Sequence, residues 1–137
     1  SVLDTKDLKV GTGKELKEDD TDYMAYYIGW CADGTIFDSS FDNAEDPKLL
    51  QSPLDPSGGL IEGWNQGVVG MKLGGVRQIT MSGDLAYGDS QEICGGYNKP
   101  LRFIVMAIEQ DAELKKLNDE LKDLYVQLYM AYQGAAS

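Results

Sequence analysis

The sequence contains no histidine and only two cysteines among its 137 residues. Histidine is the usual general base of nucleophilic triads and the commonest zinc ligand, so its absence argues against triad hydrolases and zinc enzymes. Cys31 and Cys94 form no Cys-x-x-Cys motif, and each alone is best explained as a small buried hydrophobic side chain. We therefore expect no metal site.

Basic residues are also scarce, with 12 lysines and arginines against 23 aspartates and glutamates. Binding to nucleic acid depends on Lys and Arg side chains that displace counterions from the phosphates. A formal net charge of −11 therefore argues against a nucleic-acid partner and indicates a solvated acidic surface.

Long apolar runs are absent, because no stretch approaches the 18 or more apolar residues of a membrane-spanning helix. The chain begins at Ser1, without a methionine and without the basic and apolar regions of a signal peptide. We expect a soluble polypeptide, whose start suits a mature or trimmed form. Its length is sufficient for one domain with a hydrophobic core.

The most informative stretch covers residues 60–89. Trp64, Val68 and Met71 have the spacing of one helical face, and the Gly-Gly pair that follows ends the helix. Residues 76–81 then alternate with a period of two, as in a half-buried strand. The pattern predicts a short helix, a turn and a strand, with a large indole in the first helical turn.

Several motifs surround this indole. In chain order they are Tyr-Ile-Gly (27–29), Asp-Gly-Thr-Ile-Phe-Asp-Ser-Ser (33–40), Leu-Ile-x-Gly-Trp (60–64), Gly-Met-Lys-x-Gly-Gly (70–75), Leu-Ala-Tyr-Gly (85–88) and Pro-Leu-Arg-Phe-Ile-Val (100–105). In this order and spacing, the motifs resemble the FKBP-type peptidyl-prolyl isomerase family. The resemblance covers roughly residues 7–109.

The resemblance implies an α+β fold, in which a twisted antiparallel sheet of five to six strands wraps around one short α-helix. The residue pattern agrees, since the aromatic-rich residues 22–31 suit a central strand and residues 8–10 a short edge strand. Residues 41–59 contain three of the four prolines, which favours turns and a broken edge strand. We expect an isomerase domain over residues 1–110 and a helical extension over residues 111–137.

The implied activity is cis-trans isomerisation of X-Pro bonds in protein substrates, which assists protein folding. The barrier is rotation about a partial double bond, about 18–20 kcal/mol, so the reaction needs no metal and no cofactor. A twisted amide loses resonance and its carbonyl becomes less polar, which favours a dry aromatic pocket. Macrolide inhibitors such as tacrolimus and rapamycin are further implied ligands. The alternative is a non-catalytic protein-binding or chaperone module.

The resemblance also implies which aromatic side chains form the pocket. Trp64 is the floor under the proline ring, and the walls are Tyr27, Phe37 and Phe103. Taken alone, Trp64, Phe37 and Phe103 would be better explained as ordinary core residues, and it is the set of ordered motifs that favours the pocket.

Polar and smaller groups complete the implied site. Leu60 and Ile61 form its lip, and the Ile61 backbone N–H and the Tyr87 hydroxyl hold substrate carbonyls. Asp38 is a buried carboxylate oriented toward the twisting carbonyl or toward Tyr27. The alternative for Asp38 is a turn-capping role, because Asp followed by two serines is ordinary turn chemistry.

Three positions depart from the family pattern. Leu50 stands where an aromatic pocket wall is usual, and Asn43 stands where a basic partner of Asp38 is usual. Asn43 cannot neutralise a buried charge, so we expect Asp38 to have a raised pKa or another partner, and activity to be reduced. Residues 89–99 lack the apolar pair and prolines of the family's flap loop, which bears on substrate preference and drug affinity.

By the resemblance, Cys31 ends the strand that carries Tyr27, and Cys94 lies in the flap loop, so the two can be neighbours. They form either a disulfide that ties the flap to the sheet or two free thiols. A disulfide persists only outside the reducing cytosol, so it would indicate an extracytoplasmic protein, whereas free thiols suit a cytoplasmic one.

Residues 111–132 have the clearest helical pattern of the chain. An apolar seam of alternating three- and four-residue spacing comprises Leu114, Leu117, Leu121, Leu124 and Leu128. The seam is too short for a typical coiled coil and suits packing along its own domain. From Leu124 to Tyr132, however, only Gln127 is strongly polar, which favours burial on more than one side. We predict a homodimer through this half, with intramolecular burial or a different partner as alternatives.

Overall fold

The computed structural model describes residues 1–18, 23–40, 50–51 and 61–108, and six positions between 123 and 131. These residues contain a six-stranded sheet, the α-helix α1, one short 3-10 helix and, at the six positions near the C-terminus, part of a further helix. The elements in chain order are β1 (Leu3–Lys9), β2 (Met24–Cys31), β3 (Ile36–Ser39), β4 (Leu50–Gln51), α1 (Glu62–Gly67), β5 (Val76–Met81), η2 (Gly83–Leu85) and β6 (Leu101–Ile108).

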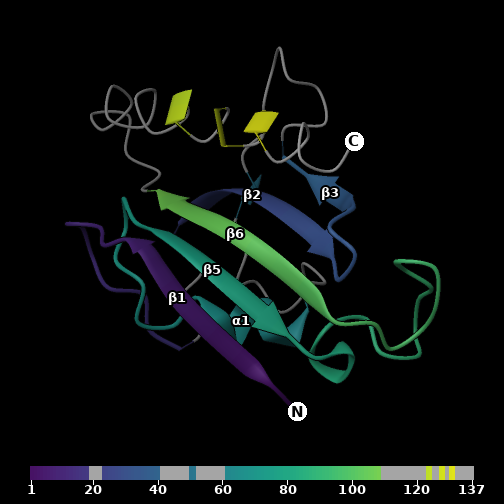
Figure 1. Ribbon diagram of the computed structural model, residues 1–137. Helices are drawn as coiled ribbons and strands as arrows, with labels where there is room; N and C mark the ends of the chain where they lie inside the picture. Colours follow the sequence, from purple (N-terminus) through teal and green to yellow (C-terminus); the bar gives the residue numbers. More distant parts are fainter. Residues whose placement is uncertain are drawn as a thin grey trace.

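The strands form one antiparallel sheet in the order β1-β5-β6-β2-β3, and β4 pairs separately with β2. Figure 1 shows the twist of this sheet and the position of α1 against one of its faces. The predicted antiparallel sheet around one short helix is therefore confirmed. The central strands β2 and β6 pair along their full length, from Met24 opposite Ile108 to Cys31 opposite Leu101.

The first strand is longer than the sequence indicated. We expected a strand only at residues 8–10, but β1 covers Leu3–Lys9 and pairs with β5 from Leu3 opposite Met81 to Lys9 opposite Val76. Its side chains are mostly polar and exposed. The backbone hydrogen bonds to β5 therefore define this edge strand. Because its side chains do not pack in the core, the sequence has no apolar periodicity there that could have predicted it.

The helix α1 lies unusually close to β5 because two of its residues lack side chains. A Cβ on Gly67 would lie 2.6 Å from Ile79 Cγ2, and one on Gly63 would overlap the sulfur of Met81. The core between helix and sheet includes Trp64, Val68, Met71, Ile79, Met81, Leu101, Phe103 and Val105. This close approach places Trp64, which is 2% exposed, at the inner face of the sheet.

The predicted C-terminal helix lies largely outside the described residues. The six described positions, 123, 124, 127, 128, 130 and 131, are helical, whereas residues 109–122 are not described. In the described part of the chain, no helix has the length and apolar character needed to cross a membrane.

A buried arginine joins the end of α1 to the sheet. Arg77, on β5, is 8% exposed; its Nη1 donates to the carbonyls of Gly67 at 3.0 Å and Val69 at 2.8 Å. Its Nε donates to Asp7 Oδ1 on β1 at 2.7 Å. The guanidinium thereby satisfies carbonyls at the helix C-terminus, where the helix dipole also favours a cation.

Replacing Arg77 with methionine should lower the free energy of unfolding by about 3 kcal/mol, because it leaves two carbonyls without their donor. Urea unfolding followed by circular dichroism measures the loss. The matched control is Asp7→Asn, which we expect to cost less than about 1 kcal/mol because the Asp7 side chain is 41% exposed. Equal losses in the two variants would show that the ion pair, rather than the carbonyl contacts, stabilises the helix end.

Candidate active site

Four aromatic side chains from four elements meet above α1. The Trp64 ring lies 5.4 Å from Phe103 and 5.4 Å from Tyr27, both edge to face. Phe37 is 5.6 Å from Phe103 in the same geometry. Such arrangements direct the positive ring edge toward the negative face of the neighbour and are favourable. The structure thus brings the sequence-predicted floor and walls into one cluster.

The backbone of β2 leaves room for this cluster. A Cβ on Gly29 would lie 2.8 Å from ring atoms of both Phe37 and Phe103. Trp64 and Phe103 are buried, whereas Tyr27 and Phe37 are only partly buried at the margin. The cluster therefore has a closed floor and an accessible edge.

The Asp38 carboxylate is bound to one of the walls. Tyr27 Oη donates to Asp38 Oδ2 at 2.6 Å, and the Ser39 N–H donates to Asp38 Oδ1 at 2.8 Å. Asp38 therefore has a partner other than Asn43, which lies outside the described residues. Orientation toward Tyr27 and capping of a neighbouring N–H, which we had treated as alternatives, occur together.

The Tyr87 hydroxyl lies in the field of this carboxylate. Burial and, secondarily, the negative charge of Asp38 raise the pKa of Tyr87 above its ordinary value. Like any tyrosine hydroxyl at neutral pH, it is protonated and can donate a hydrogen bond.

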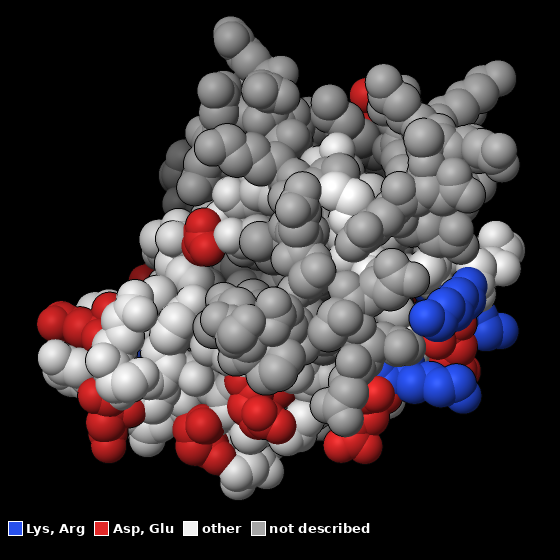
Figure 2. Space-filling view, turned by 180° about the vertical axis from the view of Figure 1, so that it is seen from behind, with Lys and Arg blue, Asp and Glu red and all other residues white. Residues whose placement is uncertain are grey.

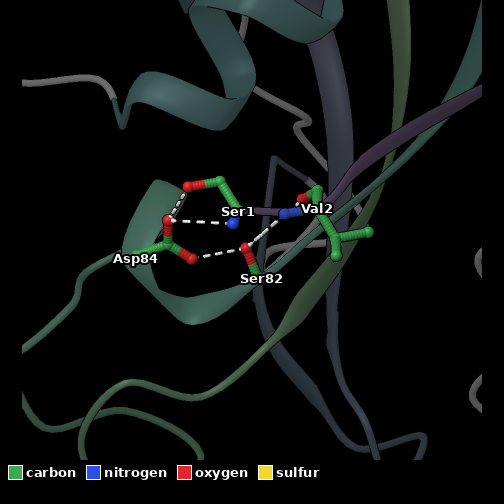
Figure 3. A network of polar contacts seen from close by, with 4 residues as sticks. All are labelled: Ser1, Val2, Ser82 and Asp84. Atoms are coloured by element: carbon green, nitrogen blue, oxygen red, sulfur yellow. Dashed lines mark hydrogen bonds and ion pairs between the residues drawn. The ribbon is translucent and has the colours of Figure 1, made fainter.

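The turn that leads to Tyr87 is tied to the start of the chain. Ser82 accepts a hydrogen bond from the Val2 N–H at 2.9 Å, and its own N–H donates to the Val2 carbonyl at 2.9 Å. Figure 3 shows that Asp84, in η2, receives hydrogen bonds from the Ser1 and Ser82 hydroxyls. These bonds lower the pKa of Asp84 and fix the turn two residues before Tyr87.

The remaining predicted lip and wall residues are only partly described. Ile61 is the residue before α1, and its carbonyl accepts hydrogen bonds from the N–H groups of Trp64 and Asn65. Leu50 lies in β4, but its side chain, like all of Leu60, is outside the described residues.

Residues 89–99 are attached to the sheet by a covalent bond. Cys31, the last residue of β2, is joined to Cys94 in a disulfide with a Cα–Cα distance of 5.6 Å. Ile93 and Gly96 exchange backbone hydrogen bonds of 2.8 and 3.2 Å, which form a tight turn around Cys94. Ile93 and Cys94 both pack against the core that contains Trp64.

Comparison with known proteins agrees with this geometry. Residues 13–108 match the family described as FKBP-type peptidyl-prolyl cis-trans isomerase. An "FK506-binding protein" of Neisseria meningitidis serogroup B is 34% identical over 104 residues, which cover 76% of this chain and 89% of that protein. The chain belongs to the FKBP-type peptidyl-prolyl cis-trans isomerase family. The resemblance expected from its motifs is confirmed, and the chain is a peptidyl-prolyl isomerase.

Solved structures of this family have the same fold. AtFKBP13 superposes with a TM-score of 0.63 at 30% identity, covering 80% of this chain and 93% of that one. FkpA from Escherichia coli superposes with a TM-score of 0.64 at 28% identity, covering 78% of this chain but only 47% of that chain.

Sequence reasoning missed one residue at the floor of this isomerase site. Trp64 Nε1 donates a hydrogen bond of 3.2 Å to the hydroxyl of Tyr23, which is fully buried. Burial raises the pKa of Tyr23, so the hydroxyl stays neutral. Tyr23 precedes Tyr27 by four residues along the strand direction, and this spacing was the signal that both lie on the inner face. By holding the indole N–H, Tyr23 fixes the orientation of Trp64.

Replacing Tyr23 with phenylalanine should destabilise the isomerase by about 1–3 kcal/mol, because the buried indole N–H loses its acceptor. It should also lower kcat/KM through a looser Trp64. A double-mutant cycle with Trp64→Phe isolates this contact, since phenylalanine has no N–H to satisfy. Urea unfolding and a protease-coupled isomerase assay measure both effects. If Tyr23→Phe costs the same in the two backgrounds, Tyr23 does not act through the indole.

Proposed function

We propose that the chain isomerises X-Pro bonds of protein substrates over the aromatic cluster of Tyr27, Phe37, Trp64 and Phe103, and thereby assists protein folding. The edge-to-face contacts of Trp64 with Tyr27 and Phe103 are the main support. These contacts place the buried indole of Trp64 between the rings of Tyr27 and Phe103. An apolar surface of this shape suits the binding of a proline ring. Membership of the isomerase family makes this cluster the natural place for the reaction.

The polar groups at the edge of the cluster would act on the twisting amide. The Tyr87 hydroxyl would donate a hydrogen bond to a substrate carbonyl. The Ile61 N–H, at the start of α1, would hold a second carbonyl. The pocket would exclude water, so that the less polar twisted amide is stabilised relative to the planar one. Asp38 would fix the Tyr27 ring through their 2.6 Å hydrogen bond.

A protease-coupled assay on a proline-containing peptide tests the proposed substrate class. The uncatalysed bond relaxes in about 10–100 s at 25 °C, so catalysis appears as a faster phase proportional to enzyme concentration. Binding of the peptide without acceleration would instead favour the alternative of a protein-binding or chaperone module.

Macrolides of the tacrolimus and rapamycin type should occupy the same cluster. Trp64→Ala should abolish their binding because it removes the floor, and Tyr87→Phe should weaken binding by about 1 kcal/mol through one lost hydrogen bond. Isothermal titration calorimetry measures both changes. Tyr97→Phe is the matched control, since Tyr97 is 56% exposed and should be neutral. Unchanged affinity in Trp64→Ala would show that the pocket lies elsewhere.

We further infer that the Cys31–Cys94 disulfide is retained in the working protein, which therefore acts outside the reducing cytosol. In the loop-entropy model, a bond across 63 residues stabilises by roughly 4 kcal/mol. It also keeps residues 89–99 against the core beside Trp64.

The unfolded, unreduced protein should therefore contain no titratable thiol. Reductant should lower the free energy of unfolding by up to roughly 4 kcal/mol in the wild type, and should have no effect on a double variant with serine at both positions. Thiol titration in denaturant and urea unfolding provide the two measurements. Two reactive thiols per chain before reduction would rule out the bond and the inferred compartment.

A further inference from the structure

The face of the sheet opposite α1, here called the outer face, is apolar and buried. Its seven buried members alternate with the inner residues on β2, β5 and β6, and they are Tyr26, Ile28, Trp30, Val76, Ile104, Met106 and Ile108. Ile28 and Met106 are 0% exposed and Trp30 is 1% exposed. An element other than α1 must therefore cover this face.

Such burial is unusual for an antiparallel sheet with a single helix. These sheets commonly pack one face on the core and leave the other solvated, so their strands alternate between apolar and polar residues. Here β2 and β6 are apolar on both faces. If the outer face were open, seven large side chains would create a patch beyond the roughly 300–600 Å² that typical monomers expose.

One described residue from outside the sheet packs against the outer face. Leu128 is half-buried there; the other partly buried residues that pack against this cluster, Met24 and Ile36, belong to the sheet itself. Its helical neighbours Leu124 and Met130 are 55% and 58% exposed, so only one side of this segment faces the protein. In Figure 1 the helical turns near the C-terminus are yellow, with β6 and β2 between them and α1.

We propose that the chain after Ile108 returns over the outer face of its own sheet and covers it, with Leu128 as an anchor. Ile108, the last residue of β6, itself belongs to the outer face and is 1% exposed. The twenty residues from Ile108 to Leu128 would reach about 30 Å as a helix, enough to return across the strands. The occupant is thus this chain's own C-terminal segment.

The proposal changes the interpretation of the leucine seam. On this proposal the segment that contains Leu128 packs within its own domain, which explains the apolar character of this part of the sequence without a second copy. Leu124 and Met130 stay accessible for contacts with a second copy, but the outer face is already occupied.

Leu128→Asp and Leu124→Asp form a matched pair for the test. The two changes introduce the same charge at the same residue type four positions apart, and differ in whether the side chain meets the outer face. In a Trp64→Phe background, Trp30 is the sole tryptophan and reports on the outer face directly. We expect Leu128→Asp to lower the urea midpoint and shift Trp30 emission to longer wavelength, and Leu124→Asp to change neither. If Leu128→Asp does not fold, Leu128→Ala replaces it in the test. We expect it to change the urea midpoint and the Trp30 emission in the same directions, but by less.

Light scattering at low and high protein concentration distinguishes the possible occupants. In place of the homodimer predicted from the sequence, we expect the wild type to be monomeric and the effect of Leu128→Asp to be independent of concentration. A wild-type dimer that Leu128→Asp converts into monomer would overturn the proposal in favour of a second copy. Equal effects of the two aspartate variants would also overturn it, because Leu128 would then have no special contact. None of these readouts depends on isomerase activity.

Discussion

The close approach of α1 to β5 is the constraint on which the rest of the structure depends. Gly63 and Gly67 permit it, because a side chain at either position would collide with Met81 or Ile79. The approach presses Trp64 against the inner face, where Tyr27 and Phe103 complete the cluster. Figure 2 shows the molecule from behind, with acidic residues distributed over its described surface. Apart from Arg77 in the sheet and Asp38 at the edge of the cluster, the residues that surround Trp64 make mainly apolar contacts.

The polar groups at the site are few, and two of them hold aromatic side chains in place. The Tyr23 hydroxyl accepts a hydrogen bond from the indole N–H of Trp64, and the Asp38 carboxylate accepts one from the Tyr27 hydroxyl. Both contacts restrict the rotation of an aromatic side chain in the cluster. An arrangement of this kind suits a reaction that breaks no covalent bond and transfers no proton, because catalysis then depends on shape and on the exclusion of water.

The sequence was most predictive where local pattern and spacing agree. The helix with Trp64, the strand that follows it and the paired strands β2 and β6 all have apolar periodicity or motifs. It was least predictive where partners distant in the chain decide the outcome. The extent of β1 depends on hydrogen bonds to β5, and the role of Tyr23 depends on an indole 41 residues away. The partner of Asp38 was likewise left open, since local chemistry allowed both of its contacts.

The composition of β2 alone does not determine how this strand is aligned with its neighbours in the sheet. Tyr26 and Tyr27 are adjacent and point to opposite faces, both of which are apolar. A slip of one residue would exchange the two sets of side chains, yet would still bury hydrophobic groups on each side. Register must therefore be specified by features that are not interchangeable: the space at Gly29, which two phenylalanine rings fill, and the Cys31 sulfur, which has only one partner. The two features that specify the alignment of β2 therefore both lie toward its C-terminal end, next to the aromatic cluster.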